Sequence, residues 1–242
     1  MAAEEEAALL LAAATDPEVL EALVCRRTAG EPLAWVVGGV DFCGLRIRVD
    51  PGVYVPRGQT EALAERAASL LPAEGVAVDL CTGAGAVAAV LRARRPEATV
   101  LGTDIDPTAV GCAQANGVEA LLGDLDAPLP PALRGSVDVI TAVVPYVPTD
   151  ELAFLPRDVV AFEPRRALDG GRGGVEVLSA LVARGASWLR PGGWLLLEIG
   201  GRQAVAVSAA LEAAGFGEII ILRDEEGDDR AMVGRKISNF GL

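Results

Sequence analysis

The sequence predicts an α/β fold in which helices cover a mainly parallel sheet. Hydrophobic residues make up 51% of the chain but aromatic residues only 4%, so Val, Leu and Ala must build a closely packed core. Four apolar runs of strand length occur, and helix-like segments separate the first three, an order that implies parallel strands joined by crossovers. The runs are residues 76–80, 98–103, 118–122 and 137–144, and the helix-like segments are residues 86–94 and 107–115.

Residue usage limits the chemistry that the chain can perform. Its formal net charge of −13 repels a phosphate backbone, so we expect no nucleic-acid partner. The chain has no histidine, which removes His-based nucleophiles and His metal sites, and its single lysine, Lys236, leaves almost no candidate for Schiff-base chemistry. Its four cysteines form no Cys-x-x-Cys pair, so we expect no metal, no disulfide framework and a cytoplasmic location. No apolar run is long enough to span a membrane, and we expect no membrane partner.

The first part of the chain differs in pattern from the rest. Two short helices are expected between residues 2 and about 29, and residues 35–49 have strand character interrupted by glycines, which indicates a hairpin. We interpret residues 1–56 as a small helical and hairpin appendage. Residues 57–242 then form the main domain.

The last third of the chain adds three more strands and their helices. A long helix is expected over about residues 173–189, ended by the segment Pro-Gly-Gly at 191–193. The other expected elements are helices at 60–71 and 202–214, strands at 194–199, 218–222 and 231–234, and an acidic turn at 224–229.

Two glycines follow the first predicted strand, where the chain turns into a helix. Residues 78–85 have the sequence Val-Asp-Leu-Cys-Thr-Gly-Ala-Gly, so the backbone at Gly83 and Gly85 can approach a ligand closely and present helix N-terminal N–H groups. Asp104 follows nineteen residues after Gly85, at the end of the second strand, where its carboxylate can accept hydrogen bonds from ribose hydroxyl groups. The pattern predicts a nucleoside-containing cofactor at this edge of the sheet.

Two cofactors fit the glycine pattern. Gly83, Gly85 and Ala88 satisfy the relaxed dinucleotide fingerprint, which favours NAD. A carboxylate at Asp79, however, suits the ammonium group of S-adenosylmethionine better than a pyrophosphate, and Asp124, after the third strand, can accept a hydrogen bond from an adenine amino group. We therefore expect S-adenosylmethionine, held by Asp79, Cys81, Thr82, Gly83, Gly85, Asp104, Ile105, Asp124 and Leu125.

The fourth strand ends in a segment with two prolines. Each residue before a proline is restricted to an extended backbone, so the carbonyls of Val144 and Val147 must find partners outside the sheet. A rigid loop of this kind can face a ligand, with the ring of Tyr146 against a substrate. The residues expected to frame the methyl acceptor are Val143, Val144, Pro145 and Tyr146.

Short motifs spread over residues 26–236 match a known enzyme family in their order and spacing. They are Arg26-Arg27 with Gly30-Glu31-Pro32-Leu33, Phe42 with Gly44, Pro51 to Arg57 with Thr60-Glu61, Glu163-Pro164, the glycines at 171, 173 and 174, and Glu198-Ile199-Gly200. By these motifs the chain resembles the release factor glutamine methyltransferase family. The resemblance implies a class I methyltransferase fold with a seven-stranded sheet, S-adenosylmethionine as cofactor, and methylation of a glutamine side-chain amide.

The chain departs from the family pattern at three motifs. Cys81 replaces the first glycine of the cofactor motif, and Gln59 replaces a glutamate in the entry motif. The family's Asn-Pro-Pro-Tyr becomes Val-Val-Pro-Tyr at 143–146. In the family the Asn side chain and the following carbonyl accept hydrogen bonds from the target amide, which Val143 cannot do through its side chain.

A fourth difference concerns the N-terminus, because only about 25 residues precede the matching region, where the family has a helical domain that binds the release factor. We therefore expect a diverged acceptor. Three hypotheses stay open at this point: methylation of a protein glutamine, methylation of a small molecule, and a non-catalytic cofactor-binding role.

Overall fold

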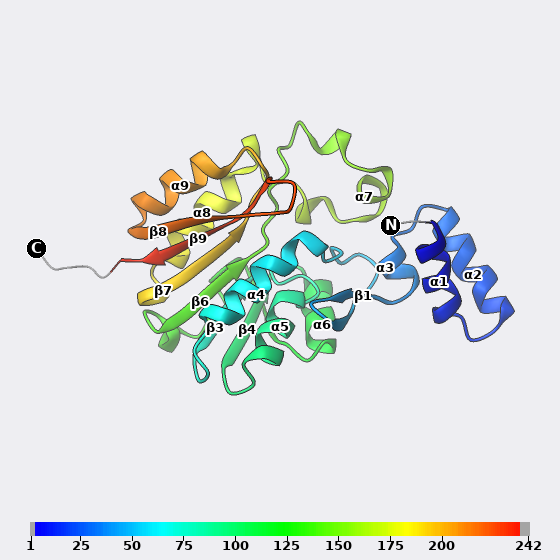
Figure 1. Ribbon diagram of the computed structural model, residues 1–242, viewed down its shortest axis with the longest axis horizontal. Coiled ribbons are helices and arrows are strands. Elements are labelled where there is room, and N and C mark those ends of the chain that lie inside the picture. Colours follow the sequence, from blue (N-terminus) through cyan, green and yellow to red (C-terminus); the bar gives the residue numbers. More distant parts are fainter. Residues whose placement is uncertain (1–2, 238–242) are drawn as a thin grey trace, which may run out of the picture.

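A seven-stranded sheet lies at the centre of the structure, a computed structural model that describes residues 3–237 (Figure 1). In chain order its strands are β3 (Val76–Leu80), β4 (Thr99–Asp104), β5 (Glu119–Leu122), β6 (Val137–Ala142), β7 (Leu189–Glu198), β8 (Phe216–Arg223) and β9 (Asp229–Lys236). Across the sheet they lie in the order β5-β4-β3-β6-β7-β9-β8. Strands β3 to β7 are parallel, and β9 runs antiparallel to both of its neighbours. The predicted α/β fold with a mainly parallel sheet is confirmed.

Helices cover both faces of this sheet (Figure 1). Successive strand residues point to opposite faces, so Ala77 and Val139 belong to one core while Val78 and Ile140 belong to the other. No helix within the described residues is long and apolar enough to cross a bilayer. The first core holds α4 (Glu61–Leu70), α5 (Ala86–Arg94) and α6 (Pro107–Ala115), and the second holds α8 (Glu176–Gly185) and α9 (Ala204–Ala213).

The strand order reverses direction beside β3. From β3 the chain builds β4 and β5 on one side, and it then returns to place β6 on the other side of β3. Ligands of open α/β sheets bind beyond the carboxyl ends of the strands at such a reversal. The fold therefore places the ends of β3 and β6 at the expected ligand site, with Asp79 opposite Thr141 in the β3–β6 register.

The N-terminal part consists of two helices, a single helical turn and a hairpin. Helices α1 (Ala3–Ala13) and α2 (Pro17–Thr28) lie apart from the sheet in Figure 1, and their small core contains Leu10 and Leu23. The hairpin strands β1 (Gly39–Phe42) and β2 (Leu45–Arg48) pack Phe42 and Ile47 into the same core as α4. The domain boundary expected at residue 56 stays a prediction.

Strand character was expected from residue 35, but the chain there is helical. Residues 33–36 form α3 (Leu33–Val36), and the buried indole N–H of Trp35 donates a 2.9 Å hydrogen bond to the carbonyl of Val53. The aromatic and β-branched residues of this segment indicated a strand, yet tertiary packing of Trp35 decides the local structure.

The helix expected over residues 173–189 is shorter than its apolar pattern indicated. Gly171, Gly173 and Gly174 have φ of 79°, 63° and 69°, in the left-handed region that a right-handed helix excludes. Helix α8 therefore begins at Glu176. It ends at Gly185, and the segment 191–193 lies inside β7, where the register against β6 is interrupted by a bulge.

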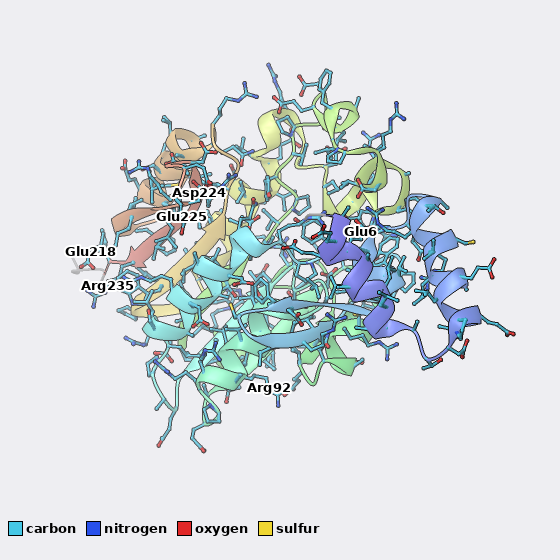
Figure 2. The ribbon with its side chains drawn as sticks, turned by 45° about the vertical axis from the view of Figure 1, so that its right-hand side comes forward. Glu6, Arg92, Glu218, Asp224, Glu225 and Arg235 are labelled. Carbon is cyan, nitrogen blue, oxygen red and sulfur yellow. The ribbon has the colours of Figure 1, made fainter. Side chains whose placement is uncertain are left out.

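The acidic turn expected at residues 224–229 joins β8 to β9. Figure 2 shows Asp224 and Glu225 at this turn, while Glu218 and Arg235 lie at the opposite ends of the two strands. Arg230 pairs with Asp224 at 2.5 Å, and Arg235 pairs with Glu218 at 3.0 Å. These ion pairs lie at the outer edge of the sheet, on the strands farthest from β3.

Candidate functional site

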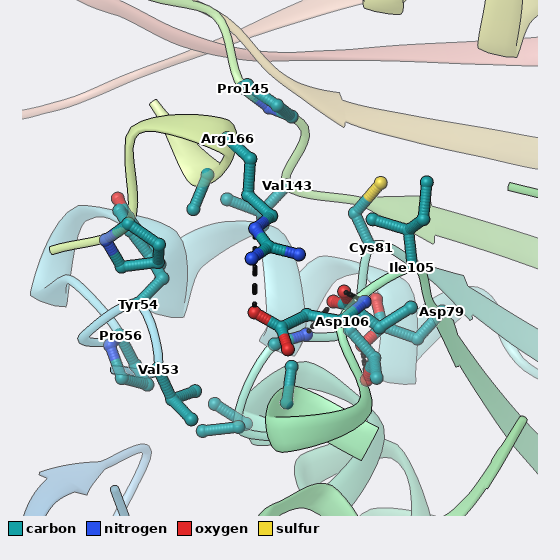
Figure 3. Close-up of a pocket in the computed structure, with 18 of the residues that line it drawn as sticks. Val53, Tyr54, Pro56, Asp79, Cys81, Ile105, Asp106, Val143, Pro145 and Arg166 are labelled. Atoms are coloured by element: carbon teal, nitrogen blue, oxygen red, sulfur yellow. Dashed lines mark hydrogen bonds and ion pairs between the residues drawn. The ribbon is translucent and has the colours of Figure 1, made fainter. Parts of the chain in front are cut away.

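A cavity of about 290 Å³ opens where the carboxyl ends of β3, β4, β5 and β6 meet (Figure 3). Its other walls come from the segment that follows the hairpin and from the long loop at residues 143–175, here named the acceptor loop. Of the predicted site residues, those that line the cavity are Asp79, Cys81, Thr82, Gly83, Asp104, Ile105, Asp124, Leu125, Val143 and Pro145. Within the described part of the chain, Gly85, Val144 and Tyr146 lie outside this lining.

Asp79 is a buried carboxylate at the floor of the cavity. It is 2% exposed, and it accepts hydrogen bonds from the hydroxyls of Thr82 at 2.6 Å and Thr141 at 2.7 Å. Burial raises the pKa of Asp79 to about 6, because the two hydroxyls compensate only part of the lost hydration. A buried anion with only neutral partners favours the approach of a cationic group.

The turn after β3 contains three residues in the left-handed conformation. Cys81, Gly83 and Gly85 have φ of 57°, 56° and 80°. A glycine adopts this backbone freely, whereas a side chain at Cys81 costs about 1 kcal/mol. The departure at Cys81 is therefore a matter of backbone conformation as well as side-chain size. A Cβ added at Gly83 would meet nothing within 4 Å, so Gly83 faces open space inside the cavity.

Gly85 has a packing role that Gly83 lacks. A Cβ at Gly85 would lie 3.0 Å from Ala113 Cβ and 3.0 Å from Val118 Cγ2, so the start of α5 approaches α6 closely only because the side chain is absent.

Gly85→Ala is expected to lower the free energy of unfolding by about 1–3 kcal/mol more than Gly83→Ala. Both variants place a side chain in the left-handed region, but only Gly85→Ala adds overpacking. Urea denaturation of the two variants beside the unmodified protein measures the difference. Equal losses of stability in the two variants would contradict the packing role of Gly85.

Asp104 anchors the glycine turn from the neighbouring strand. Its carboxylate oxygens accept hydrogen bonds from the N–H of Gly83 and the N–H of Asp106, both at 2.9 Å. Burial is the largest cause of the raised pKa of Asp104. Each oxygen keeps a second lone pair for a ribose hydroxyl. The adjacent Ile105 is 59% exposed at the cavity, which provides an apolar surface for a flat ring.

Two of the predicted cofactor-binding residues, Asp124 and Leu125, follow the end of β5. Asp124 accepts a 2.7 Å hydrogen bond from the guanidinium of Arg184, so one of its oxygens already has a partner. Leu125 is buried with φ of 50°, and its carbonyl accepts a 2.8 Å hydrogen bond from the hydroxyl of Thr103. That bond joins the segment after β5 to β4.

The start of the acceptor loop places its residues in different surroundings. Val143 and Pro145 line the cavity, whereas Val144 is buried in the core beneath α8 and α9. The hydroxyl of Tyr146 donates to Glu198 at 2.9 Å and accepts from Gln59 at 3.1 Å. The hydroxyl of Tyr146 thus belongs to a polar network with Gln59 and Glu198, and its expected place beside the acceptor stays a prediction.

The buried carboxylate of Glu163 connects the acceptor loop to the segment after the hairpin. The sequence had indicated no partner for this residue. Glu163 has a side chain 1% exposed, and it pairs with Arg57 at 2.5 Å and accepts from the N–H of Val55 at 3.4 Å. Burial raises the pKa of Glu163, although the charge of Arg57 opposes the rise. Arg57 also lies over the ring of Tyr54, 4.9 Å from its centre. The acceptor loop is therefore fixed at this point.

Arg166 and Asp106 form a second contact that no sequence motif indicated. Figure 3 shows the guanidinium of Arg166 extending from the acceptor loop across the cavity toward Asp106. Arg166 Nε lies 3.7 Å from Asp106 Oδ2. The two residues are sixty positions apart in the sequence, so only the fold brings them together.

The donor and acceptor groups of the cavity fit S-adenosylmethionine. Asp79 would supply an anion for its positive charge, Asp104 would supply oxygens for its ribose, and the open space at Gly83 would admit a ligand against the backbone.

Comparison with known proteins identifies the family. A family model described as "Methyltransferase small domain" matches residues 44–123. The release factor glutamine methyltransferase of Geobacter sulfurreducens is 36% identical over 91% of this chain and 80% of its own length. That of Mycolicibacterium smegmatis is 38% identical over 92% of this chain and 82% of its own length. The chain belongs to the release factor glutamine methyltransferase family.

Solved structures of other methyltransferases share the fold. The ribosomal protein L11 methylase of Lactobacillus delbrueckii is 19% identical, with a TM-score of 0.56 over 79% of this chain and 86% of that one. A 16S rRNA methyltransferase of T. thermophilus, solved with AdoMet and guanosine, is 20% identical, with a TM-score of 0.55 over 84% of this chain and 45% of that one. The protein is an S-adenosylmethionine-dependent methyltransferase, which confirms the predicted family, enzyme class and cofactor against the NAD alternative.

Proposed function

We propose that this methyltransferase acts on an acceptor other than the glutamine side chain of a release factor. The observation that supports the proposal is Val143, which lines the cavity where the family has the amide-orienting Asn. A valine side chain offers no atom that accepts a hydrogen bond from an amide N–H. The wall around Val143 is apolar, with Val53 and Pro145 beside the same cavity, and it suits an apolar acceptor.

The chemistry requires little acid or base from the chain. The bound cofactor supplies a methyl group that is already activated on a sulfonium, so the protein contributes position, orientation and the exclusion of water. Asp79 and Asp104 would hold the cofactor, and the acceptor loop, fixed by the Glu163–Arg57 pair, forms another wall of the cavity. This division of tasks explains how a chain without histidine performs methyl transfer.

We place the acceptor among small molecules, and we place the enzyme in the cytoplasm without a nucleic-acid or membrane partner. The cavity has a volume of about 290 Å³ and is largely apolar on its acceptor side, a feature of small-molecule sites. The acidic composition and the scattered cysteines support the remaining expectations.

The unmodified protein is expected to methylate a release-factor glutamine peptide weakly or not at all, and Val143→Asn is expected to increase that activity. A missing hydrogen bond to a desolvated amide costs about 1–3 kcal/mol, or roughly ten- to a hundredfold in rate. Mass spectrometry of the peptide after incubation with S-adenosylmethionine measures the modified glutamine. Val160→Asn, at an exposed position of α7 (Arg157–Phe162), is the matched control and should leave the peptide unmodified.

Efficient methylation of this peptide by the unmodified protein would overturn the proposal. The chain would then have the family's ordinary acceptor in spite of Val143.

A further inference from the structure

The charged residues of the cavity are divided between its two sides. The cofactor wall, formed by the lining residues between 79 and 125, contains four carboxylates and no cation. The acceptor wall, formed by the lining residues at 42–60 and 143–177, contains one charged side chain, Arg166. The carboxylates of the cofactor wall are Asp79, Asp104, Asp106 and Asp124.

Arg166 has most of its hydrogen-bonding capacity available. Its side chain is 62% exposed, and among the described residues its one ionic partner is Asp106, at 3.7 Å, which is longer than a hydrogen bond. Asp106 is already used elsewhere, because its Oδ1 accepts from the N–H of Thr108 at the start of α6. The preceding Arg165 is different, since its guanidinium donates twice to Asp169, at 3.1 and 3.0 Å.

An exposed guanidinium with one long ionic contact, at the edge of an acidic cavity, favours a molecule that carries a negative group. Apart from Asp124, which Arg184 already compensates, these carboxylates disfavour an anionic molecule, so such a molecule binds best beside a cation. Arg166 is the cation that the lining provides, and its planar fork matches a carboxylate. The rest of the acceptor wall around it is mainly apolar, with Val53, Pro56 and Val143 among its residues.

We infer that Arg166 determines acceptor specificity by binding a carboxylate on an otherwise apolar small molecule. The inference rests on the proposed function, because a release-factor glutamine has no such group. On binding, the acceptor's carboxylate replaces Asp106 as the partner of Arg166. The nucleophile that receives the methyl group is a different atom of the same molecule.

Three probes with one apolar body test this inference: 3-phenylpropanoate, 3-phenylpropanamide and 3-phenylpropylamine. Their dissociation constants are measured by calorimetry on the protein saturated with S-adenosylhomocysteine. We expect the carboxylate to bind about tenfold more tightly than the amide, whereas the amine shows how strongly the carboxylates of the cavity favour a cation. Arg166→Gln is expected to abolish this preference, whereas the matched control Arg165→Gln retains it. S-adenosylhomocysteine should bind all three proteins with affinities within about twofold, which also shows that the variants are folded.

Three results would overturn the inference. The first is no preference for the carboxylate in the unmodified protein, which includes no measurable binding at millimolar concentration, and the second is a preference that survives Arg166→Gln. The third is a loss of S-adenosylhomocysteine affinity in Arg166→Gln, which would place Arg166 against the cofactor. The peptide assay separates this inference from the proposed function. An unmodified peptide together with no carboxylate preference defeats the role of Arg166 alone, whereas an efficiently methylated peptide defeats both.

Discussion

Asp104→Ala is expected to lower the affinity for S-adenosylmethionine about a hundredfold. Hydrogen bonds from two ribose hydroxyls to a carboxylate contribute about 1.5–3 kcal/mol each, so the loss of both amounts to two decades or more. The structure adds a second cause, because the same carboxylate accepts from the N–H of Gly83 and the N–H of Asp106. Its removal takes away one of the hydrogen bonds that hold the glycine turn to β4.

Calorimetry with Asp104→Ala, Asp104→Asn and Asp124→Ala measures this effect. Asp104→Asn keeps one acceptor oxygen and should fall between the unmodified protein and the alanine variant. Asp124→Ala should lose less affinity for S-adenosylmethionine than Asp104→Ala, because one oxygen of Asp124 already accepts a hydrogen bond from Arg184. An unchanged affinity in Asp104→Ala would remove this residue from the cofactor site.

In the absence of cofactor, the free energy of unfolding of Asp79→Asn is expected to rise relative to that of the unmodified protein as the pH increases from 4 to 7. The expected gain is up to about 3 kcal/mol. The pKa of Asp79 is raised from 3.8 to about 6 in the folded state by burial. Between these two values the folded protein holds a proton that the unfolded chain releases, so the stabilisation present below pH 4 is lost as the pH passes 6. An asparagine has no such titration.

Urea denaturation of both proteins at a series of pH values measures the difference. Asp104 and Glu163 also have raised pKa values, but they are common to both proteins and largely cancel in the comparison. Parallel stability curves for the two proteins between pH 4 and 7 would show that the Asp79 carboxylate is already ionised when buried.

Most of the fold could be predicted from local patterns in the sequence. The alternation of apolar runs and helix-like segments located β3, α5, β4 and α6 within a residue or two, because each element has its own period and end signals. The helix expected over residues 173–189 is shorter in the structure, because the glycines at 171, 173 and 174 have positive φ and the helix begins only at Glu176. The Pro-Gly-Gly segment then indicated a helix end where the structure has a bulge in β7.

The candidate site could be predicted only where its residues follow strands. Asp79, Asp104 and Asp124 come directly at strand ends, so a sheet topology is enough to bring them together. Glu163 and Arg166 belong to a loop with little regular structure, and their partners lie 106 and 60 residues away in the sequence. No local periodicity connects such positions, and their pairing is a result of tertiary packing.

Burial places the pKa values of several side chains in the cavity some pH units apart. Asp79 titrates near 6, whereas the pKa of Tyr54 is raised to about 12 and that of the Cys81 thiol is raised well above its usual value. From roughly pH 7 to pH 10 these side chains each keep one charge state. An inflection of the methylation rate in that interval therefore comes from a group other than these three, such as the acceptor or the amino group of the cofactor. An inflection that moves when the acceptor is changed then belongs to the acceptor.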